Sequence, residues 1–357
     1  MTDNLSSKCF APTDNCTGEA FGEVFLAMTD NLSSKCFAPT DNCTGEAFGE
    51  VFLAMTDNLS SKCFAPTNNC TGEAFGELFL AMTDNLSSKC FAPTDNEQLT
   101  TDKFMQNQIV FITGASSGIG AACAKIFAHA GAKLILAARR WERLQQLADS
   151  LDIAADKIHL LQLDVCERLA VESAIANLPS SWKNIDLLIN NAGLSRGLSK
   201  LHEGDFQDWE EMIDTNIKGL LYLTRYVVPG MVERNHGHVI NIGSIAGHQT
   251  YPGGNVYCGT KAAVKAISEG LKQDLLGTAV RVTSVDPGMV ETEFSQVRFH
   301  GDTERAKKVY AGIKPLTPDD VADVIFFCAT RASHVNINEV ILMPVDQASA
   351  TLVNRQV

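Results

Sequence analysis

Tyr257 and Lys261 lie four positions apart in a segment with helical periodicity, so their side chains share one face of a helix. A phenol with a pKa of about 10 exchanges protons poorly at neutral pH. A neighbouring ammonium favours the phenolate, and lowering that pKa by about 3 units corresponds to ~4 kcal/mol. The hydroxyl of Ser244 is suited to hold a substrate oxygen against the phenol. The trio predicts acid–base chemistry at an alcohol or carbonyl, although each residue alone also fits a purely structural role.

A glycine-rich turn is the second chemical feature. The apolar run Ile109–Ile112 is typical of a strand buried on both faces, and Ala121–Phe127 has the pattern of a helix packed on a sheet. Glycines between them let the backbone approach a pyrophosphate, whose charge the helix start favours. The turn therefore predicts a dinucleotide site, and an oxidised nicotinamide there would add positive charge near Tyr257. The expected cofactor-binding residues of the turn are Gly114, Ser116, Ser117, Gly118, Ile119 and Gly120.

The residues after the second expected strand select the cofactor. An acidic residue at this place usually binds the ribose hydroxyls of NAD, whereas a 2′-phosphate requires a guanidinium. The chain has Ala138 where the acid would stand, followed by Arg139 and Arg140. This pattern predicts NADP, with the alternative that the two arginines only begin a surface helix.

Alternating strands and helices must position these groups. The alternation predicts an α/β fold with a single Rossmann-type, doubly wound parallel sheet of about seven strands, whose ligands bind beyond the carboxyl ends. Further strands are expected at 133–138, 158–163, 186–189, 238–242, 280–285 and 340–343. Helices are expected at 141–151, from about 167, at 209–233, at 256–276 and after 317–318.

The first part of the chain consists of tandem repeats. Residues 1–81 hold three nearly identical 27-residue units, and a fourth copy is incomplete. Such identity suggests a recent duplication, and the polar composition favours a flexible extension over residues 1–104, with an ordered or interacting array as the alternative. We expect the catalytic domain at 105–357 to work without the extension, and Met105 is a candidate for the true start.

Composition excludes several classes of protein. The net charge of −13 argues against a nucleic-acid partner. No run approaches the ~18 apolar residues of a membrane span, and the first residues carry no secretory signal, so we expect a cytoplasmic protein. The eleven cysteines are odd in number and form no C-x-x-C pair, so we expect neither a disulfide framework nor a metal site.

Five motifs in order resemble the short-chain dehydrogenase/reductase family over about residues 107–345. The motifs are Thr113–Gly120, Asn190–Gly193, Ser244, Tyr257 with Lys261, and Asp286–Gly288. The resemblance implies a single-domain Rossmann fold, hydride transfer without a metal, a small-molecule substrate and a homotetramer.

The resemblance also implies roles for individual residues. Tyr257 would be the general acid–base, and Ser244 would bind the substrate oxygen. Lys261 would bind the nicotinamide ribose and lower the tyrosine pKa, and Asn216 would support a water-linked proton relay. Asp164 would touch the adenine. The other implied cofactor contacts are Asn191, Pro287, Gly288, Val290 and Thr292.

Four further stretches resemble one group in this family, the NADP-dependent 3-hydroxy acid dehydrogenases. They are Leu136–Arg140, Phe299–Asp302, His334–Asn338 and Met343–Val345. This implies oxidation of serine, allo-threonine or 3-hydroxypropionate and reduction of malonic semialdehyde. The alternatives are a reductase of 3-oxoacyl thioesters or general carbonyls, and an NADP-binding scaffold that presents the repeats to a partner.

A 3-hydroxy acid brings a carboxylate into the site, and a guanidinium is its simplest partner. Arg196 and Arg298 follow strand ends on the expected active-site side. We therefore expect at least one of them to contact the substrate carboxylate, with the alternative that both are surface residues.

Overall fold

The computed structural model describes residues 105–356. The predicted repeats, and their boundary with the catalytic domain, lie outside the described residues. Within 105–356, no helix combines the length and apolarity that crossing a membrane would need.

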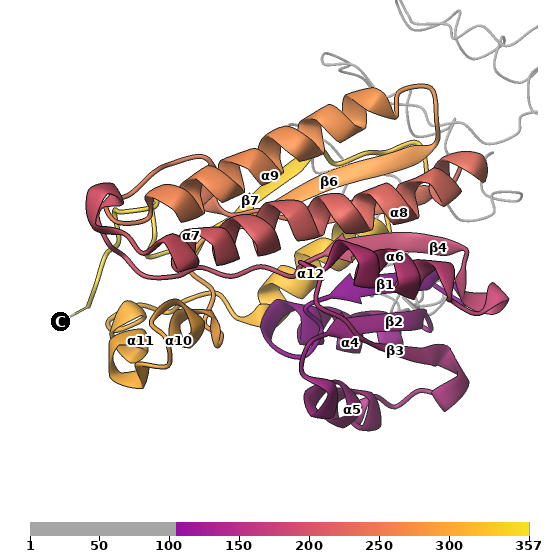
Figure 1. The fold of residues 1–357 in the computed structure, drawn as a ribbon, viewed down its shortest axis with the longest axis horizontal. Coiled ribbons are helices and arrows are strands. Elements are labelled where there is room, and N and C mark those ends of the chain that lie inside the picture. The colour runs from indigo at the N-terminus through magenta and orange to yellow at the C-terminus, as the bar shows by residue number, and fades with distance from the viewer. Residues whose placement is uncertain (1–104, 357) are drawn as a thin grey trace, which may run out of the picture. The chain divides into compact units, whose positions relative to one another are not determined.

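A parallel sheet forms the centre of the fold, in the strand order β3-β2-β1-β4-β5-β6-β7 (Figure 1). The predicted Rossmann-type sheet of about seven strands is therefore confirmed. The order reverses between β1 and β4, and ligands of such sheets bind at this switch point, beyond the carboxyl ends. The strands are β1 (Ile109–Thr113), β2 (Lys133–Ala138), β3 (Ile158–Gln162), β4 (Ile185–Asn190), β5 (Gly237–Ile242), β6 (Val280–Pro287) and β7 (Glu339–Leu342).

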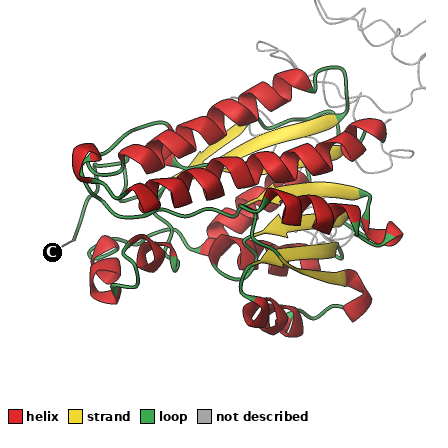
Figure 2. Ribbon diagram, in the orientation of Figure 1, coloured by secondary structure: helices red, strands yellow, loops and turns green. Residues whose placement is uncertain are grey.

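Helices cover both faces of the sheet (Figure 2). Val110 and Ile112 of β1 pack with α4, α5 and α12, whereas Ile109 and Phe111 pack with α6, α8 and α9. Alternate residues of a strand face opposite sides, which explains why β1 is apolar throughout. These helices are α4 (Gly118–His129), α5 (Trp141–Ser150), α6 (Arg168–Ala176), α8 (Leu220–Glu233), α9 (Asn255–Asp274) and α12 (Pro318–Ala329).

The prediction of one long helix over 209–233 is wrong in one respect, because a π-helical turn interrupts the α-helix. It consists of α7 (Phe206–Ile213), a π-helical turn (Asp214–Gly219) and α8. The turn contains Asn216, whose amide is bound to groups on other segments. Such contacts, and not the local periodicity, decide where a π-helical turn occurs, and these turns are frequent at functional sites.

Two short helices, α10 (Phe294–Arg298) and α11 (Thr303–Val309), follow β6 and lie beyond the carboxyl ends of the strands (Figure 1). Their segment is held to the rest of the domain by hydrogen bonds. The hydroxyl of Tyr310 donates to Val290 O at 2.8 Å, and Gly197 N donates to Arg298 O at 2.8 Å. The segment therefore covers the edge of the sheet where the site is expected.

Candidate active site

The glycine turn packs tightly on the end of β4. Gly114 and Gly118 have φ angles of +64° and +53°, which side chains other than glycine adopt rarely. A Cβ on Gly120 would lie 2.5 Å from Gly114 O and 2.6 Å from Asn191 Nδ2. The Asn191 amide in turn donates to Thr113 O at 2.8 Å. The turn is thus a bare backbone surface at the start of α4, which fits a pyrophosphate.

Arginines gather beside this turn. Arg140 donates from Nη2 to Ser117 Oγ at 2.7 Å and to Ser116 Oγ at 3.0 Å. Its Nη1 donates to a carboxylate oxygen of Glu293 at 2.9 Å. Arg139 is more exposed and lies 3.7 Å from Asp164. The structure therefore brings both predicted arginines to the carboxyl edge of the sheet, where the cofactor is predicted to bind. Arg140 lies directly on the glycine turn.

Two residues at this edge were missed by the sequence analysis. Arg143, from the first turn of α5, donates to both oxygens of Glu293 at 2.6 and 2.7 Å. Arg143 and then Arg140 hold the pKa of Glu293 below its ordinary value. Arg143 stands three positions after Arg140 at the start of a helix, and this spacing was the only feature of the sequence that could have placed it beside Arg140. No feature of the local sequence could have placed Glu293 there.

Ser244 and Tyr257 meet at the carboxyl end of β5. The Ser244 hydroxyl caps the turn after the strand by accepting from Ala246 N at 3.1 Å. It also donates to Pro287 O at 3.4 Å, and its proximity to Tyr257 lowers the pKa of the phenol. Both side chains are buried. A substrate oxygen bound to Ser244 would therefore stand next to the phenol.

Lys261 is anchored to the sheet. Its buried ammonium donates to Ile242 O, the last carbonyl of β5, at 2.8 Å and lies 6.0 Å from the centre of the Tyr257 ring. Burial lowers the pKa of Lys261 to about 8, against the opposing effect of Asp286. A Cβ on Gly193 would lie 3.5 Å from Nζ, so the loop after β4 passes close to the ammonium.

The predicted lowering of the Tyr257 pKa is wrong for the protein by itself. Burial raises the pKa of the phenol, and the neighbouring Tyr251 raises it further. Arg298 and the nearby hydroxyl of Ser244 act in the opposite direction. Desolvation of a fully buried phenol outweighs these groups, because it penalises the charged form directly.

Asn216 braces two segments. Its Nδ2 donates to Leu194 O at 2.8 Å and to Thr260 Oγ1 at 3.0 Å, and its Oδ1 accepts from Leu194 N at 2.8 Å. The amide thus ties the loop after β4 to α9, one residue from Lys261. Both amide hydrogens are donated to protein groups, so towards a further partner the side chain can only accept.

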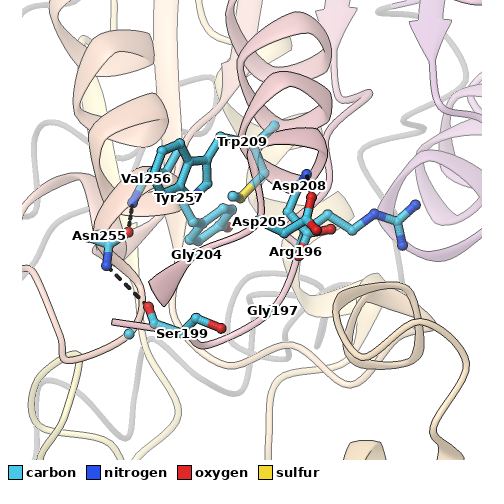
Figure 3. Close-up of a pocket in the computed structure, with 12 residues that line it drawn as sticks. Arg196, Gly197, Ser199, Gly204, Asp205, Asp208, Trp209, Asn255, Val256 and Tyr257 are labelled. Atoms are coloured by element: carbon cyan, nitrogen blue, oxygen red, sulfur yellow. Dashed lines mark hydrogen bonds between the residues drawn. The ribbon is translucent and has the colours of Figure 1, made fainter. Parts of the chain in front are cut away.

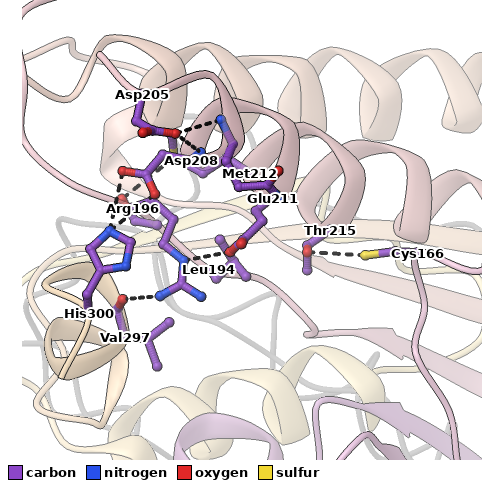
Figure 4. Close-up of polar contacts among 12 residues, drawn as sticks. Cys166, Leu194, Arg196, Asp205, Asp208, Glu211, Met212, Thr215, Val297 and His300 are labelled. Atoms are coloured by element: carbon purple, nitrogen blue, oxygen red, sulfur yellow. Dashed lines mark hydrogen bonds and ion pairs between the residues drawn. The ribbon is translucent and has the colours of Figure 1, made fainter. Parts of the chain in front are cut away.

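The two candidate carboxylate-binding arginines have different surroundings. Arg196 forms an ion pair with Glu211 of α7 at 2.7 Å and donates to Val297 O, as Figure 4 shows. Arg298 donates to Tyr251 Oη at 2.7 Å, and its guanidinium carbon lies 5.2 Å from the centre of the Tyr257 ring. The structure therefore brings Arg298, and not Arg196, to the face of Tyr257.

A small pocket lies beside Tyr257 on the side of α7 (Figure 3). Its volume of about 20 Å³ accommodates roughly one water molecule. The side chains that line it include Arg196, Asp205, Asp208, Trp209, Val256 and Tyr257.

The remaining predicted cofactor residues lie along the carboxyl edge. Asp164 accepts from Cys166 N at 3.0 Å, and Gly288 N donates to Leu342 O at 2.7 Å. The Thr292 methyl would lie 3.2 Å from a Cβ on Gly118, so the segment after β6 touches the glycine turn. Pro287 and Val290 precede Thr292 in this segment, and Val290 bridges to Leu316.

A charged cluster behind the site was also missed by the sequence analysis. His248 Nε2 lies 2.6 Å from Asp286 Oδ2, and Lys265 Nζ lies 3.1 Å from His248 Nδ1 and 3.2 Å from Glu339 Oε1. The histidine and the two carboxylates have the types of metal ligands. The ammonium of Lys265 is paired with Glu339, and His248 is paired with Asp286, so these groups form an ion-pair network.

Comparisons with known proteins show which proteins the chain resembles. The family model described as short chain dehydrogenase matches residues 108–302. The chain is 52% identical over 250 residues, 70% of this chain and 100% of the relative, to the NADP-dependent 3-hydroxy acid dehydrogenase YdfG of Escherichia coli (strain K12). It is 45% identical over 241 residues, 68% of this chain and 95% of the relative, to the serine 3-dehydrogenase of Agrobacterium fabrum.

Solved structures give the same picture. The closed form of a serine dehydrogenase complexed with NADP+ is 52% identical to this chain, with a TM-score of 0.67. The similarity covers 70% of this chain and 100% of that one. A metagenomic short-chain oxidoreductase in complex with NADP is 28% identical, with a TM-score of 0.58 over 68% of this chain and 99% of that one.

Proposed function

This chain belongs to the short-chain dehydrogenase/reductase family, and from that premise we propose that it transfers a hydride between NADP and carbon 3 of a small 3-hydroxy acid. The substrate class is that of serine, allo-threonine and 3-hydroxypropionate, with malonic semialdehyde on the carbonyl side. The observation that carries the proposal is the guanidinium of Arg298 on the face of Tyr257, 5.2 Å from the ring centre. It provides a carboxylate partner next to the acid–base group.

The residues of the carboxyl edge fit NADP. The glycine turn, which is packed so tightly that a Cβ on Gly120 would lie 2.5 Å from Gly114 O, supports binding of the pyrophosphate by bare backbone. Arg140, with Arg139 beside it, supplies guanidinium groups for the 2′-phosphate, and Asp164 lies where the adenine is expected. The remaining cofactor contacts that we propose are Asn191, Pro287, Gly288, Val290 and Thr292.

In this reaction the protein itself must transfer one proton. NADP, when bound, supplies the hydride acceptor or donor and a positive charge in its oxidised form. During oxidation, the Tyr257 phenolate takes the proton of the substrate hydroxyl while Ser244 holds the same oxygen by a hydrogen bond. Arg298 and Ser244 stabilise the phenolate against the effect of burial. In the reverse direction, the phenol returns the proton to the carbonyl oxygen.

Lys261 and Asn216 support this proton transfer. We assign Lys261, held by the end of β5, to the nicotinamide ribose, where its ammonium adds positive charge near the phenol. Asn216 keeps α9 and the loop after β4 in register around that ammonium. A relay water next to Asn216 would donate to the amide oxygen, because the amide hydrogens are in use.

A substrate panel tests the proposal. NADPH oxidation is measured with malonic semialdehyde and with an acetoacetyl thioester, and NADP+ reduction with serine, allo-threonine and 3-hydroxypropionate. We expect turnover of the acids and little of the thioester. Turnover should be lost in Tyr257→Phe but not in Tyr226→Phe, a tyrosine in the middle of α8 whose hydroxyl donates to Glu172 of α6. A preference for the thioester would assign the chain to the 3-oxoacyl reductases. Binding of NADPH without any turnover would favour the scaffold.

We also propose a homotetramer, which the family resemblance implies. Light scattering should then give a mass about four times the 38.6 kDa of one chain. A monomeric mass in the presence of saturating NADPH would contradict it.

A further inference from the structure

The carboxylate of Glu293 is held by two guanidinium groups at the cofactor edge. Arg140 approaches one oxygen to 2.9 Å, and Arg143 approaches the two oxygens to 2.6 and 2.7 Å. Glu293 stands at the start of α10, the helix that ends with Arg298. One ion-pair cluster thus links the arginines beside the glycine turn to the segment that covers the substrate side.

Four of the five N–H donors of Arg140 are used in this arrangement. Its Nε and Nη2 donate to the hydroxyls of Ser116 and Ser117, and its Nη1 donates to Glu293. A hydroxyl can turn and donate to a phosphate, but a carboxylate only accepts. A 2′-phosphate that arrives at Arg140 can therefore share the site with the two serines, whereas it competes with Glu293 for the same N–H groups.

We propose that Glu293 occupies, in the protein without NADP, the anion position that the 2′-phosphate takes, and that Arg143 is a second ligand of this phosphate. This inference rests on the proposed role of Arg140 towards NADP. Binding of the phosphate separates Glu293 from both arginines and frees the start of α10. A cofactor without the 2′-phosphate leaves the ion pairs in place. Glu293 therefore makes the position of Arg298 depend on which cofactor is bound.

Binding measurements on the full-length chain test this inference. The dissociation constants of NADPH, NADH, adenosine 2′,5′-bisphosphate and adenosine 5′-monophosphate are measured by calorimetry for the wild type, Glu293→Gln and Glu291→Gln. Glu291 is an exposed carboxylate two residues earlier in the same segment and serves as the matched control. We expect Glu293→Gln to bind the bisphosphate and NADPH about 3-fold to 10-fold more tightly, because the competing anion is gone. NADH and the monophosphate should be unaffected, and Glu291→Gln should match the wild type.

Two further readouts keep the outcome decisive. Arg143→Gln should weaken binding of the bisphosphate and leave the monophosphate unchanged. Addition of the bisphosphate should increase hydrogen exchange of the amides of 293–299 in the wild type, and to a smaller extent in Glu293→Gln, whose segment is already free. Unchanged or weaker binding of the bisphosphate by Glu293→Gln would overturn the inference, because Glu293 would then only hold the arginines in place. Equal affinity of wild type for NADPH and NADH would instead refute the proposed role of Arg140.

Discussion

The guanidinium of Arg298 lies across the ring of Tyr257, 5.2 Å from its centre, while its Nη2 is bound to the hydroxyl of Tyr251. The positive charge lowers the pKa of the Tyr257 phenol at a place where burial raises it. We propose that the same charge also binds the carboxylate of a substrate held by Ser244. One side chain can thus serve both the proton transfer and the recognition of an acid.

Arg298→Met should raise the KM for serine or 3-hydroxypropionate by about 10-fold or more, the loss of a charge-assisted hydrogen bond of ~1.5–3 kcal/mol. The methyl ester of the same acid should be affected far less, because it carries no charge to pair. Steady-state kinetics on acid and ester measure the difference. Arg196→Met is the comparison, since Arg196 is bound to Glu211, and we expect it to change acid and ester alike. If Arg298→Met also treats them alike, Arg298 is not the carboxylate site.

Arg140→Leu should raise the KM for NADPH by roughly 10-fold or more and leave that for NADH nearly unchanged, because only NADPH carries the 2′-phosphate that we assign to the guanidinium on the glycine turn. Arg139→Leu should have a smaller effect, since Arg139 is more exposed and lies 3.7 Å from Asp164. The double change Ala138→Asp with Arg139→Leu should shift preference towards NADH. Equal kcat/KM of the wild type for both cofactors would contradict the assignment.

The sheet could be predicted from the sequence because its signal is local. Each strand is a segment of four to eight residues rich in Val, Ile or Leu, and buried parallel strands are typically of this kind. The π-helical turn at Asp214–Gly219 could not be predicted, because it depends on the contacts of Asn216 with Leu194 and Thr260. The sequence pattern there continues the helical period without a break.

Gly120→Ala should abolish tight NADPH binding while the fold is kept, because the added Cβ would lie 2.5 Å from Gly114 O and force the turn out of place. Fluorescence titration with NADPH measures the loss, and circular dichroism checks the fold. Gly270→Ala is the matched control on α9, where a Cβ would meet nothing within 4 Å. That change should stabilise the protein by up to about 1 kcal/mol. Normal NADPH binding by Gly120→Ala would mean that the turn does not carry the pyrophosphate.

The stability of the protein should depend on pH through Lys261. Its pKa falls from 10.5 to about 8 on folding, so between these values the unfolded chain binds more protons at this position than the folded one. Stability from this group therefore rises with pH across that window. Relative to Lys261→Met, the wild type should gain up to about 3 kcal/mol in the free energy of unfolding between pH 7 and pH 10.

Urea denaturation at both pH values measures this difference. Lys272→Met, on the same helix, is the control and should show no such gain. A constant gap between wild type and Lys261→Met would show that the ammonium is not destabilised by burial.

A shortened chain that begins at Met105 should fold, bind NADPH and turn over like the full chain. Every strand of the sheet and every residue assigned to the site lies after that point. Met105 itself is buried, so the shortened chain keeps this contact. Activity and thermal unfolding of the two chains are compared directly. Loss of either in the shortened chain would mean that residues 1–104 contribute to the domain.

The site was predictable to the extent that its residues carry local motifs. Tyr257, Lys261 and the glycines are marked by spacing, and Ser244 by its place after a strand. The cluster of Glu293 with Arg140 and Arg143 carries no such mark, because its members are about 150 positions apart along the chain. The direction of the Tyr257 pKa shift also could not be predicted from the sequence, because the burial of the phenol depends on the whole fold.

The bond from Lys261 to the last carbonyl of β5 gives the reacting centre a fixed reference in the middle of the sheet. The loops around the site can differ between relatives that act on different substrates. The position of the ammonium stays the same as long as β5 stays paired with β4 and β6. New substrate preferences can therefore be reached by changing loops alone. Substitutions in the core under β5 would change the rate of proton transfer, although these residues are remote from any ligand.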